Sequence, residues 1–305
     1  MLVPDFSVYS IILLQTCYPV CYTTTRNLAM KVNQPSPNTQ HIPSGLSVLE
    51  FVAQDLPPSA PETICKIQKK WNIAVKNLKT SKKKTSEALQ QAFNTLSQLH
   101  WTGQLQPFHI IDLHDLSIFF TADWLTDDHE LVMLEALKED LVGIGKANES
   151  FIENMAFMVL LGNAFRDQNY TDKSYEWIRK QGDALRNGEK QYLTTIVNQG
   201  GVHWVAIILD FDKKHLYYGD SFRTKISAEH HRIINWWTEY HGVQFTLHTL
   251  PTAQQRDSFS CGIFAWDALR LFYGLEKSLM DPGYPLECRA KVFLRLSKHY
   301  RVSVK

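Results

Sequence analysis

The sequence predicts an α+β fold in which flanking helices surround a small central mixed sheet. Three observations support this prediction. The run 202–211 is apolar on both faces, as expected of a strand in the middle of a sheet. Extended patterns lie on either side of it, at 192–197 and 216–219. Apolar residues at helical spacing recur at 131–141 and 262–275, which indicates helices before and after the strands.

The chain divides into three segments of different character. Residues 1–60 are rich in Pro, Ser, Thr, Asn and Gln, and we expect a flexible tail, because this composition buries too little apolar surface to offset the ordering entropy. Residues 61–104 are predicted to form a helical segment of two helices, with Ile64, Ile67 and Trp71 at three- and four-residue intervals. Residues 105–305 carry the sheet and are predicted to form the main domain.

Later elements of this domain have recognisable starts and stops. Ser227 is expected to cap a helix that ends at Gly242. From Val243 to Leu247, apolar and polar residues alternate, which predicts a half-buried strand. The segment 262–275 is the last well-marked apolar helix.

Composition and charge restrict the class of protein. With 44% hydrophobic and 21% charged residues, the chain is globular. Lys and Arg (32) nearly cancel Asp and Glu (31), so the whole chain has no field that would gather nucleic acid or an acidic membrane. Only the lysine-rich run from Lys76 to Lys84 could form a nuclear-targeting or nucleic-acid patch; the alternative, which we favour, is a solvated helix face and turn.

The cysteines and the N-terminus bear on the compartment. The five cysteines are scattered without Cys-x-x-Cys spacing, which argues against a disulfide scaffold and a structural zinc site and favours a reducing compartment. The apolar run 10–14 is far shorter than the roughly 20 residues that span a bilayer, and no basic residue precedes it. We therefore expect an intracellular protein, nuclear or cytoplasmic, with no membrane partner.

His203 and Asp220 are the first two candidate catalytic residues. His203 lies inside the apolar strand, where a titratable ring has no obvious structural purpose, and Asp220 ends the next extended run 17 residues later (220 minus 203). If a tight turn pairs the two strands antiparallel, the imidazole and the carboxylate become neighbours near one end of the sheet. The carboxylate can then orient the ring and stabilise the imidazolium.

Cys261 is the candidate nucleophile. It lies between the polar loop 254–260 and an apolar helix, and a helix N-terminus favours the thiolate. Gly262 permits close approach of a substrate. Gln255, on the same loop, has an amide N–H that could point at the oxygen of a tetrahedral intermediate, together with the backbone N–H of Cys261.

Each of these signals is weak alone, because a single strand histidine is more often a satisfied core or surface residue. Their combination is more specific. Among the 12 histidines, only His203 lies inside a continuous apolar strand that is closely followed by a strand-ending acid. Cys288 has no comparable loop before it, and we expect a buried or idle thiol there.

Together, four stretches of the sequence resemble the Ulp/sentrin-specific protease family, which processes SUMO and related ubiquitin-like proteins. They are Gly201-Val202-His203-Trp204, Tyr218-Gly219-Asp220-Ser221, Gln255-Arg256-Asp257-Ser258-Phe259-Ser260-Cys261-Gly262 and Trp124-Leu125-Thr126-Asp127-Asp128. The last resembles the family's Trp-Leu-Asn-Asp-Glu segment. The resemblance covers about residues 105–290 and implies a papain-like or adenain-like cysteine protease architecture.

By this likeness, Cys261 would be the nucleophile, His203 the base and Asp220 the residue that orients it. Gln255 would donate to the oxyanion. Trp204 would roof a narrow channel for a Gly-Gly tail, because a flat aromatic lid admits glycine and excludes a Cβ. The alternative for Trp204 is an ordinary core indole. No metal or organic cofactor is expected.

The same likeness places residues 124–128 against the body of the ubiquitin-like partner, with Trp124, Asp127 and Asp128 as the expected contacts. Four residues depart from the family pattern. Ser260 stands where the family often has Asp, and Asp257 where Asn is frequent. Thr126 and Asp128 replace Asn and Glu. These departures leave the preferred modifier open.

The predicted function is therefore a thiol peptidase and isopeptidase that cleaves after the C-terminal Gly-Gly of a ubiquitin-like modifier, with SUMO as the first choice, in precursor processing and deconjugation. One alternative keeps the chemistry and changes the substrate to NEDD8, ubiquitin or an ordinary protein. Another is a catalytically silent protein that only binds SUMO, or a protein that derives from a mobile element and is tethered to DNA by its basic N-terminal helices. The presence of all four catalytic residue types argues against silence.

Overall fold

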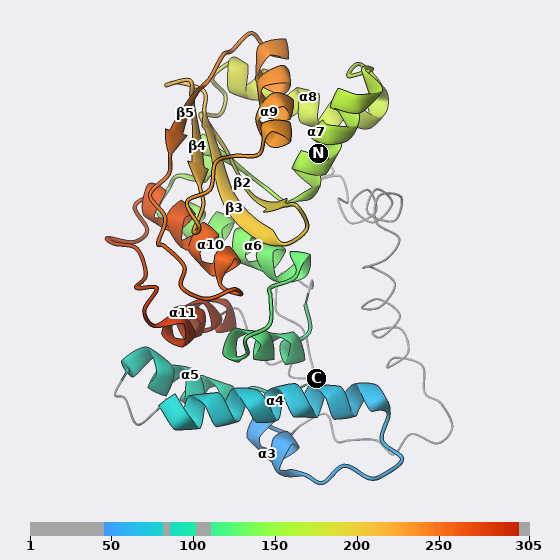
Figure 1. The fold of residues 1–305 in the computed structure, drawn as a ribbon, viewed down its shortest axis with the longest axis vertical. Coiled ribbons are helices and arrows are strands. Elements are labelled where there is room, and N and C mark those ends of the chain that lie inside the picture. Colours follow the sequence, from blue (N-terminus) through green and yellow to red (C-terminus); the bar gives the residue numbers. More distant parts are fainter. Residues whose placement is uncertain (1–45, 82–85, 102–110, 299–305) are drawn as a thin grey trace.

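The structure of the protein is a computed structural model that describes residues 46–81, 86–101 and 111–298. At its centre lies a five-stranded mixed sheet with the strands in chain order, flanked by helices (Figure 1), which confirms the predicted α+β class. The strands are β1 (Ser150–Glu153), β2 (Tyr192–Gln199), β3 (His203–Asp210), β4 (His215–Gly219) and β5 (Thr246–Thr249).

The strand β3 is the middle strand of the sheet, as its uniformly apolar sequence predicted. It pairs antiparallel with β2 and with β4, whereas β1 and β5 run parallel to their neighbours. All eight residues of β3 are buried. A strand with both faces covered needs apolar side chains at every position rather than at alternate ones.

Helices cover both faces of the sheet and enclose two apolar cores (Figure 1). On one side Ile196, Ala206 and Ile208 of the sheet share a core with α6 (Asp127–Gly143) and α10 (Cys261–Phe272). On the other side the alternate residues of the same strands pack against a second set of helices. That set is α7 (Ala156–Asp167), α8 (Glu176–Arg186) and α9 (Ala228–Tyr240), the last capped by Ser227 as predicted. The short 3-10 segments are η2 (Leu113–Phe120), η3 (Ala147–Glu149) and η4 (Lys173–Tyr175).

A two-glycine turn sets where β3 begins. Gly200 and Gly201 connect β2 to β3 with φ values of 70° and 79°, a left-handed conformation that glycine adopts without steric cost. The turn leaves His203 opposite Gln199 as the first residue of β3. Sequence and turn geometry together therefore place this histidine at one end of the sheet.

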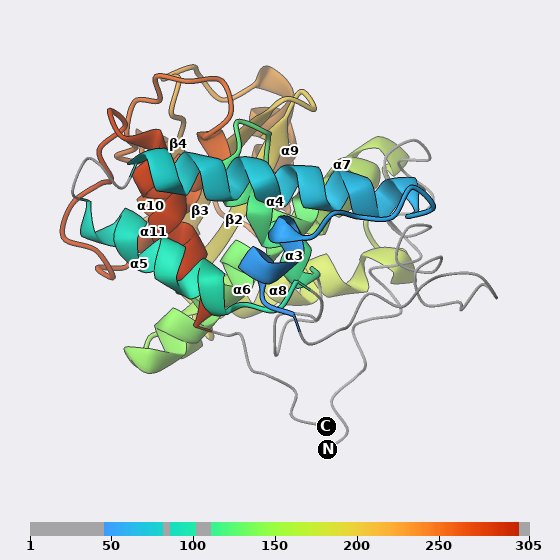
Figure 2. The same ribbon diagram turned by 90° about the horizontal axis from the view of Figure 1, so that it is seen from below.

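The two helices predicted within 61–104 are present as α4 (Glu62–Ser81) and α5 (Glu87–Gln98). Helix α5 packs against α11 (Pro285–Ser297) and α4 against η2, and the view from below shows both helices on this side of the molecule (Figure 2). Their buried side chains, such as Trp71 and Leu96, belong to the same core as those of α10 and α11. The division of the chain at residue 104 stays a prediction. None of the described helices is both long and apolar enough to cross a membrane.

Four helices were not anticipated: α3 (Val48–Ala53), α7, α8 and α11. Helix α3 lies within the segment assigned to the flexible tail, of which residues 1–45 lie outside the described residues. Ser47 and Glu50 form a reciprocal capping box at its start, and Val48 and Phe51 are fully buried. Average composition hides such a short local signal. Helix α11 follows the helix taken as the last well-marked one and begins with proline at its first turn.

The predicted strand from Val243 to Leu247 starts later than expected. The paired residues of β5 are Thr246–Thr249, and their alternation is shifted, so that Leu247 is 48% exposed and His248 is half-buried. β5 is the last strand in the order of the sheet. An edge position constrains burial less than a central one, so alternation is a poorer guide to register there.

Candidate active site

The structure brings His203 and Asp220 together at one end of the sheet, through the antiparallel pairing of β3 and β4. The imidazole Nε2 lies 2.6 Å from Oδ1 of Asp220. Both residues are buried, with exposed fractions of 8% and 7%. In such surroundings a hydrogen-bonded carboxylate holds the ring in one orientation and tautomer.

The loop that follows β4 wraps around the carboxylate of Asp220. The backbone N–H of Phe222 donates to Oδ1 at 2.7 Å, and both the N–H (3.0 Å) and the hydroxyl of Thr224 donate to Oδ2. Burial raises the pKa of Asp220, but the hydrogen bonds from His203, Thr224 and Phe222 outweigh it and hold the pKa below its ordinary value. Asp220 is therefore an ionised, firmly oriented acid. Sequence reasoning missed Thr224, although an aspartate before a short polar turn is a known local signal.

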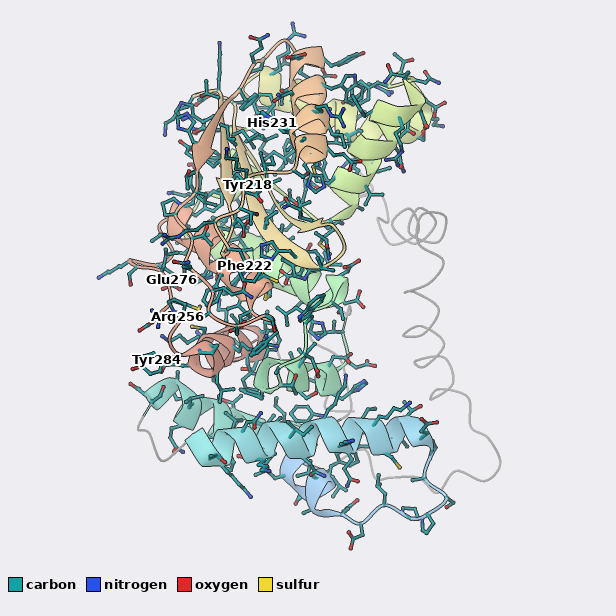
Figure 3. All side chains as sticks on the ribbon, viewed as in Figure 1. Tyr218, Phe222, His231, Arg256, Glu276 and Tyr284 are labelled. Atoms are coloured by element: carbon teal, nitrogen blue, oxygen red, sulfur yellow. The ribbon has the colours of Figure 1, made fainter. Side chains whose placement is uncertain are left out.

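An aromatic ring covers the histidine. Phe222 stacks on the imidazole of His203 with 4.8 Å between ring centroids and 25° between planes. Figure 3 shows Phe222 below Tyr218, at the lower end of the sheet. Phe222 is itself 47% exposed, so this stacked ring covers one face of the buried imidazole from the surface side.

Cys261 is the first residue of α10, with Ser260 as its N-cap, and it is 6% exposed. Burial by itself lowers the pKa of His203, but the interactions with Asp220 and Cys261 outweigh it and raise the pKa to about 9. Within the described residues, the second ring nitrogen, Nδ1, is buried and makes no hydrogen bond, although Cys261 lies near enough to raise the pKa of the ring. Because Asp220 occupies Nε2, Nδ1 is the ring nitrogen that remains without a hydrogen bond.

The raised pKa of His203 predicts how stability depends on pH. A folded-state pKa of about 9 lies above the ordinary value of 6.5, so the folded protein holds this proton more tightly than the unfolded chain. The stabilisation is fully present below pH 6.5 and is lost as the pH rises through about 9. We expect the difference in free energy of unfolding between the wild type and His203→Gln to shrink over this window in urea titrations. A difference that grows with pH would contradict the assignment.

Gln255 is held in one orientation by its neighbours. Its side-chain oxygen accepts from the Ser221 hydroxyl at 2.8 Å, and its Nε2 donates to the backbone oxygen of Asp257 at 2.7 Å. Its own backbone N–H donates to the carbonyl of Ser221 at 3.0 Å. Ser221 directly follows Asp220, so these bonds tie the Gln255 loop to the acid. The same Nε2 also lies 3.4 Å from Oδ1 of Asp257, and donation by the amide to an oxyanion stays a prediction.

Asp257 shapes the loop that precedes Cys261. Its Oδ1 accepts from the backbone N–H groups of Phe259 and Ser260, both at 2.9 Å. An aspartate that hydrogen-bonds the backbone two and three residues ahead stabilises a tight turn. Sequence reasoning treated Asp257 only as a departure from the family pattern. Its position four residues before Cys261 is the signal that could have revealed this role.

A buried acid from another helix lies against the start of α10. Glu130, on α6, is fully buried, and neither carboxylate oxygen has a hydrogen-bond partner among the described residues. Burial, together with negative charge at Cys261 and Asp127, raises its pKa well above the ordinary value, although Arg289 opposes this. A Cβ at position 262 would overlap Glu130 Oε1. Close packing against Glu130 therefore explains why a glycine stands at position 262. Its predicted contact with substrate stays a prediction.

The predicted substrate-contacting residues lie on two adjoining elements. Trp204 is only 4% exposed and donates its indole N–H to the backbone oxygen of Leu125 at 3.2 Å, which ties β3 to the segment before α6. Trp124 is 50% exposed. Asp127 and Asp128 are half-buried in the first turn of α6. Burial, and to a lesser extent the neighbouring acids, raise the pKa of Asp128 to about 6. The burial of Trp204 is also what an ordinary core indole would show, so its role as a channel lid stays a prediction.

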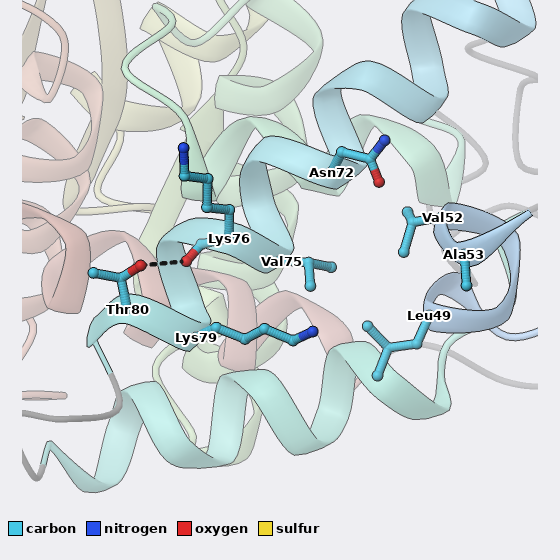
Figure 4. A pocket seen from close by; sticks show the side chains of 8 residues that line it. All are labelled: Leu49, Val52, Ala53, Asn72, Val75, Lys76, Lys79 and Thr80. Carbon is cyan, nitrogen blue, oxygen red and sulfur yellow. Dashed lines mark hydrogen bonds between the residues drawn. The ribbon is translucent and has the colours of Figure 1, made fainter. Parts of the chain in front are cut away.

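The remaining candidates lie outside this constellation. Cys288 is buried, as expected, and burial raises the pKa of its thiol to about 12. Two lysines of the lysine-rich run, Lys76 and Lys79, line a hollow between α3 and α4 (Figure 4). None of the candidate site residues lines this hollow. Residues 82–84 of the run lie outside the described residues. Within the described part of the chain, one group could bring three ligand atoms to a metal ion, and none of its members is a candidate site residue. That group is Asp112, His114 and Asp115.

Comparison with known proteins identifies the domain. Residues 123–281, just over half of the chain, match the family model described as the Ulp1 protease family, C-terminal catalytic domain. The match confirms the resemblance seen in the sequence. No curated protein matches the chain.

Several solved structures are similar to this one. One is the C-terminal Ulp1 protease domain in complex with Smt3, the yeast ortholog of SUMO, at 20% identity over 70% of this chain and 96% of that chain, with a TM-score of 0.49. Another is the Xanthomonas campestris effector XopD bound to ubiquitin, at 22% identity over 56% of this chain and 92% of that chain, with a TM-score of 0.39. The catalytic domain of the Chaetomium thermophilum Ulp1-like SUMO protease shares 13% identity over 58% of this chain and 72% of that chain, with a TM-score of 0.37.

Proposed function

The chain belongs to the Ulp1 protease family of cysteine peptidases, and on that premise we propose that it hydrolyses the bond after the C-terminal Gly-Gly of a ubiquitin-like protein, with SUMO as the first choice. The observation that carries this proposal is the hydrogen bond between His203 and Asp220 beside Cys261 at the start of α10. A thiol becomes an effective nucleophile when a base next to it takes its proton and a third group orients that base.

In the proposed reaction, the proton of Cys261 already resides on His203 as an imidazolium–thiolate pair, in keeping with the raised pKa of the ring, and the sulfur attacks the carbonyl carbon of the terminal glycine. Gln255 and the backbone N–H of Cys261 donate hydrogen bonds to the resulting oxyanion. The bond to the leaving amine then breaks, and the amine takes the proton from His203, leaving a thioester. His203 next deprotonates a water that attacks the thioester, which releases the terminal glycine as a carboxylic acid and restores the imidazolium–thiolate pair; the acid then gives its own proton to solvent.

Substrate selection in this proposal rests on the two adjoining elements that meet at Leu125. The indole of Trp204 covers an extended tail and admits only residues without a Cβ, so a Gly-Gly sequence is selected by shape. The exposed ring of Trp124 offers an apolar contact to the folded body of the modifier, and the acids of the first turn of α6 offer polar ones. Precursor processing and deconjugation both require this single cleavage.

Electrophilic probes test the proposal directly. Vinyl-sulfone or aldehyde derivatives of SUMO, NEDD8 and ubiquitin are incubated separately with the wild type, and covalent adducts are detected by mass spectrometry. We expect the SUMO probe to react fastest, at Cys261. The Cys288→Ala variant should react like the wild type, because that thiol is buried and lies outside the site.

The Cys261→Ala variant should form no adduct. If the NEDD8 or ubiquitin probe reacted faster, the proposed chemistry would stand, but the preferred substrate would be that modifier instead of SUMO. Absence of an adduct with every probe would contradict a ubiquitin-like substrate and favour an ordinary protein substrate or a silent binding protein.

A further inference from the structure

We propose that Arg289, on α11, is a positioning residue for this active site. The inference deepens the proposed function and rests on it for the identity of the nucleophile. Arg289 lies beyond residue 281, the last residue that the family model matches. It is nevertheless fully buried, and its guanidinium reaches two segments of the site at once.

The guanidinium donates to four main-chain carbonyls, three within residues 118–123 and one in the loop before Cys261. Nη1 bonds to Phe259 at 3.0 Å, and Nη2 bonds to Asp123 at 3.0 Å. The other two bonds run to η2, from Nη2 to Ile118 at 2.7 Å and from Nε to Phe119 at 3.3 Å. The guanidinium also lies over the ring of Phe259, with its central carbon 5.3 Å from the ring centroid.

Two of these carbonyls belong to segments that the proposed reaction requires. Phe259 stands two residues before Cys261, in the loop that Asp257 folds. Asp123 directly precedes Trp124, the exposed ring of the predicted substrate surface. One planar, rigid group therefore sets the distance between the nucleophile loop and this surface, with η2 as the fixed support.

The choice of arginine follows from its geometry. A guanidinium presents five N–H donors in a fixed fork and can bind several carbonyls in different directions, whereas a lysine ammonium is a point charge on a flexible stem. Burying a cation is costly unless it is well hydrogen-bonded. Burial lowers the pKa of Arg289 to about 10, while negative charge at Asp257, Asp123, Cys261 and Glu130 opposes this. At neutral pH the group therefore keeps its charge and its full set of donors.

A charge-conserving substitution separates geometry from charge. Arg289→Lys keeps the cation and loses the fork, so the loop before Cys261 should move relative to His203. The measurement is the rate at which iodoacetamide alkylates Cys261 at neutral pH, followed by mass spectrometry of the peptide that contains it. We expect alkylation about tenfold slower than in the wild type, and kcat for the Gly-Gly substrate to fall in parallel, because small misplacements of reacting groups cost one to two orders of magnitude.

Arg270→Lys is the matched control. Arg270 is also buried, and its guanidinium lies over the Trp266 ring, but it hydrogen-bonds the carboxylates of Asp140 and Glu276 rather than the nucleophile loop. We expect this variant to lose stability and to keep the wild-type alkylation rate. If Arg289 had only a structural role, Arg289→Lys would likewise lower stability and leave the alkylation rate unchanged.

A folded Arg289→Lys variant that alkylates at the wild-type rate would overturn the inference. If the variant melts below the assay temperature, all three proteins are compared in the cold, where circular dichroism shows them folded. Alkylation needs no ubiquitin-like substrate. The inference therefore fails or holds independently of which modifier, if any, the wild type cleaves.

Discussion

Replacing His203 by alanine is expected to lower kcat for a Gly-Gly substrate by about 10²- to 10⁴-fold, the range that a positioned general base contributes. The expected change in KM is less than about threefold, because the ring sits behind the nucleophile and binds neither the tail nor the body of the modifier. The structural reason is the raised pKa of His203, which the interactions with Asp220 and Cys261 maintain against the effect of burial. Steady-state hydrolysis of a fluorogenic substrate measures both constants.

The control for this prediction is His215→Ala. His215 begins β4 and contacts Tyr217 and His248 near the far end of the strand from Asp220, so its loss should leave kcat unchanged. Equal turnover in His203→Ala and the wild type would remove His203 from the role of base. A large rise in KM with constant kcat would instead assign it to substrate binding.

The second large effect is expected from Gly262→Ala. A Cβ at this position would overlap Oε1 of Glu130, and both groups are fully enclosed at the start of α10. Either α10 or the Glu130 side chain must move, and overpacking of this kind lowers the free energy of unfolding by about 1–3 kcal/mol. Because Cys261 is the neighbouring residue, kcat should also fall by about 10²-fold. Thermal unfolding and probe labelling measure the two effects.

A double variant tests the cause of that loss. Truncating Glu130 to alanine makes room for the added methyl group, so Glu130→Ala combined with Gly262→Ala should be more active and more stable than Gly262→Ala alone. Gly162→Ala is the matched control, because a Cβ there would meet no atom closer than 3.5 Å. Ordinary contact in a helix makes that substitution neutral or slightly stabilising. Failure of the second substitution to restore either property would exclude Glu130 as the obstacle.

Much of the candidate site could be predicted because its parts have local signals. His203 stands out as a titratable residue in an apolar strand, and Asp220 ends the next one. The spacing between them placed the two side chains together once an antiparallel turn was assumed, and the structure has this pairing. Cys261 is marked by the change from a polar loop to an apolar helix. Each of these residues is marked by the pattern immediately around it, and only the pairing of His203 with Asp220 also needs the turn between them.

The supporting residues have no such signals. Glu130 is separated from Gly262 by more than a hundred residues, and the partners of Arg289 on η2 are 170 and 171 residues away. Nothing in the local pattern of α6 or α11 distinguishes these charged side chains from ones that face solvent. The edge strand β5 shows the same limit on a smaller scale, since its register follows from pairing with β4 rather than from its own alternation.

The sequence by itself determined the α+β class, the central position of β3 and the identity of the candidate nucleophile, base and acid. These follow from residue type and short-range periodicity, which act wherever the segment lies in the fold. Only the tertiary structure decided that Glu130 packs beneath Gly262, that Asp220 is enclosed by Thr224 and that Arg289 donates to the carbonyls of both Phe259 and Asp123. The physical reason is that burial and hydrogen bonding of these groups depend on which distant segments meet, and that is a property of the whole packed core.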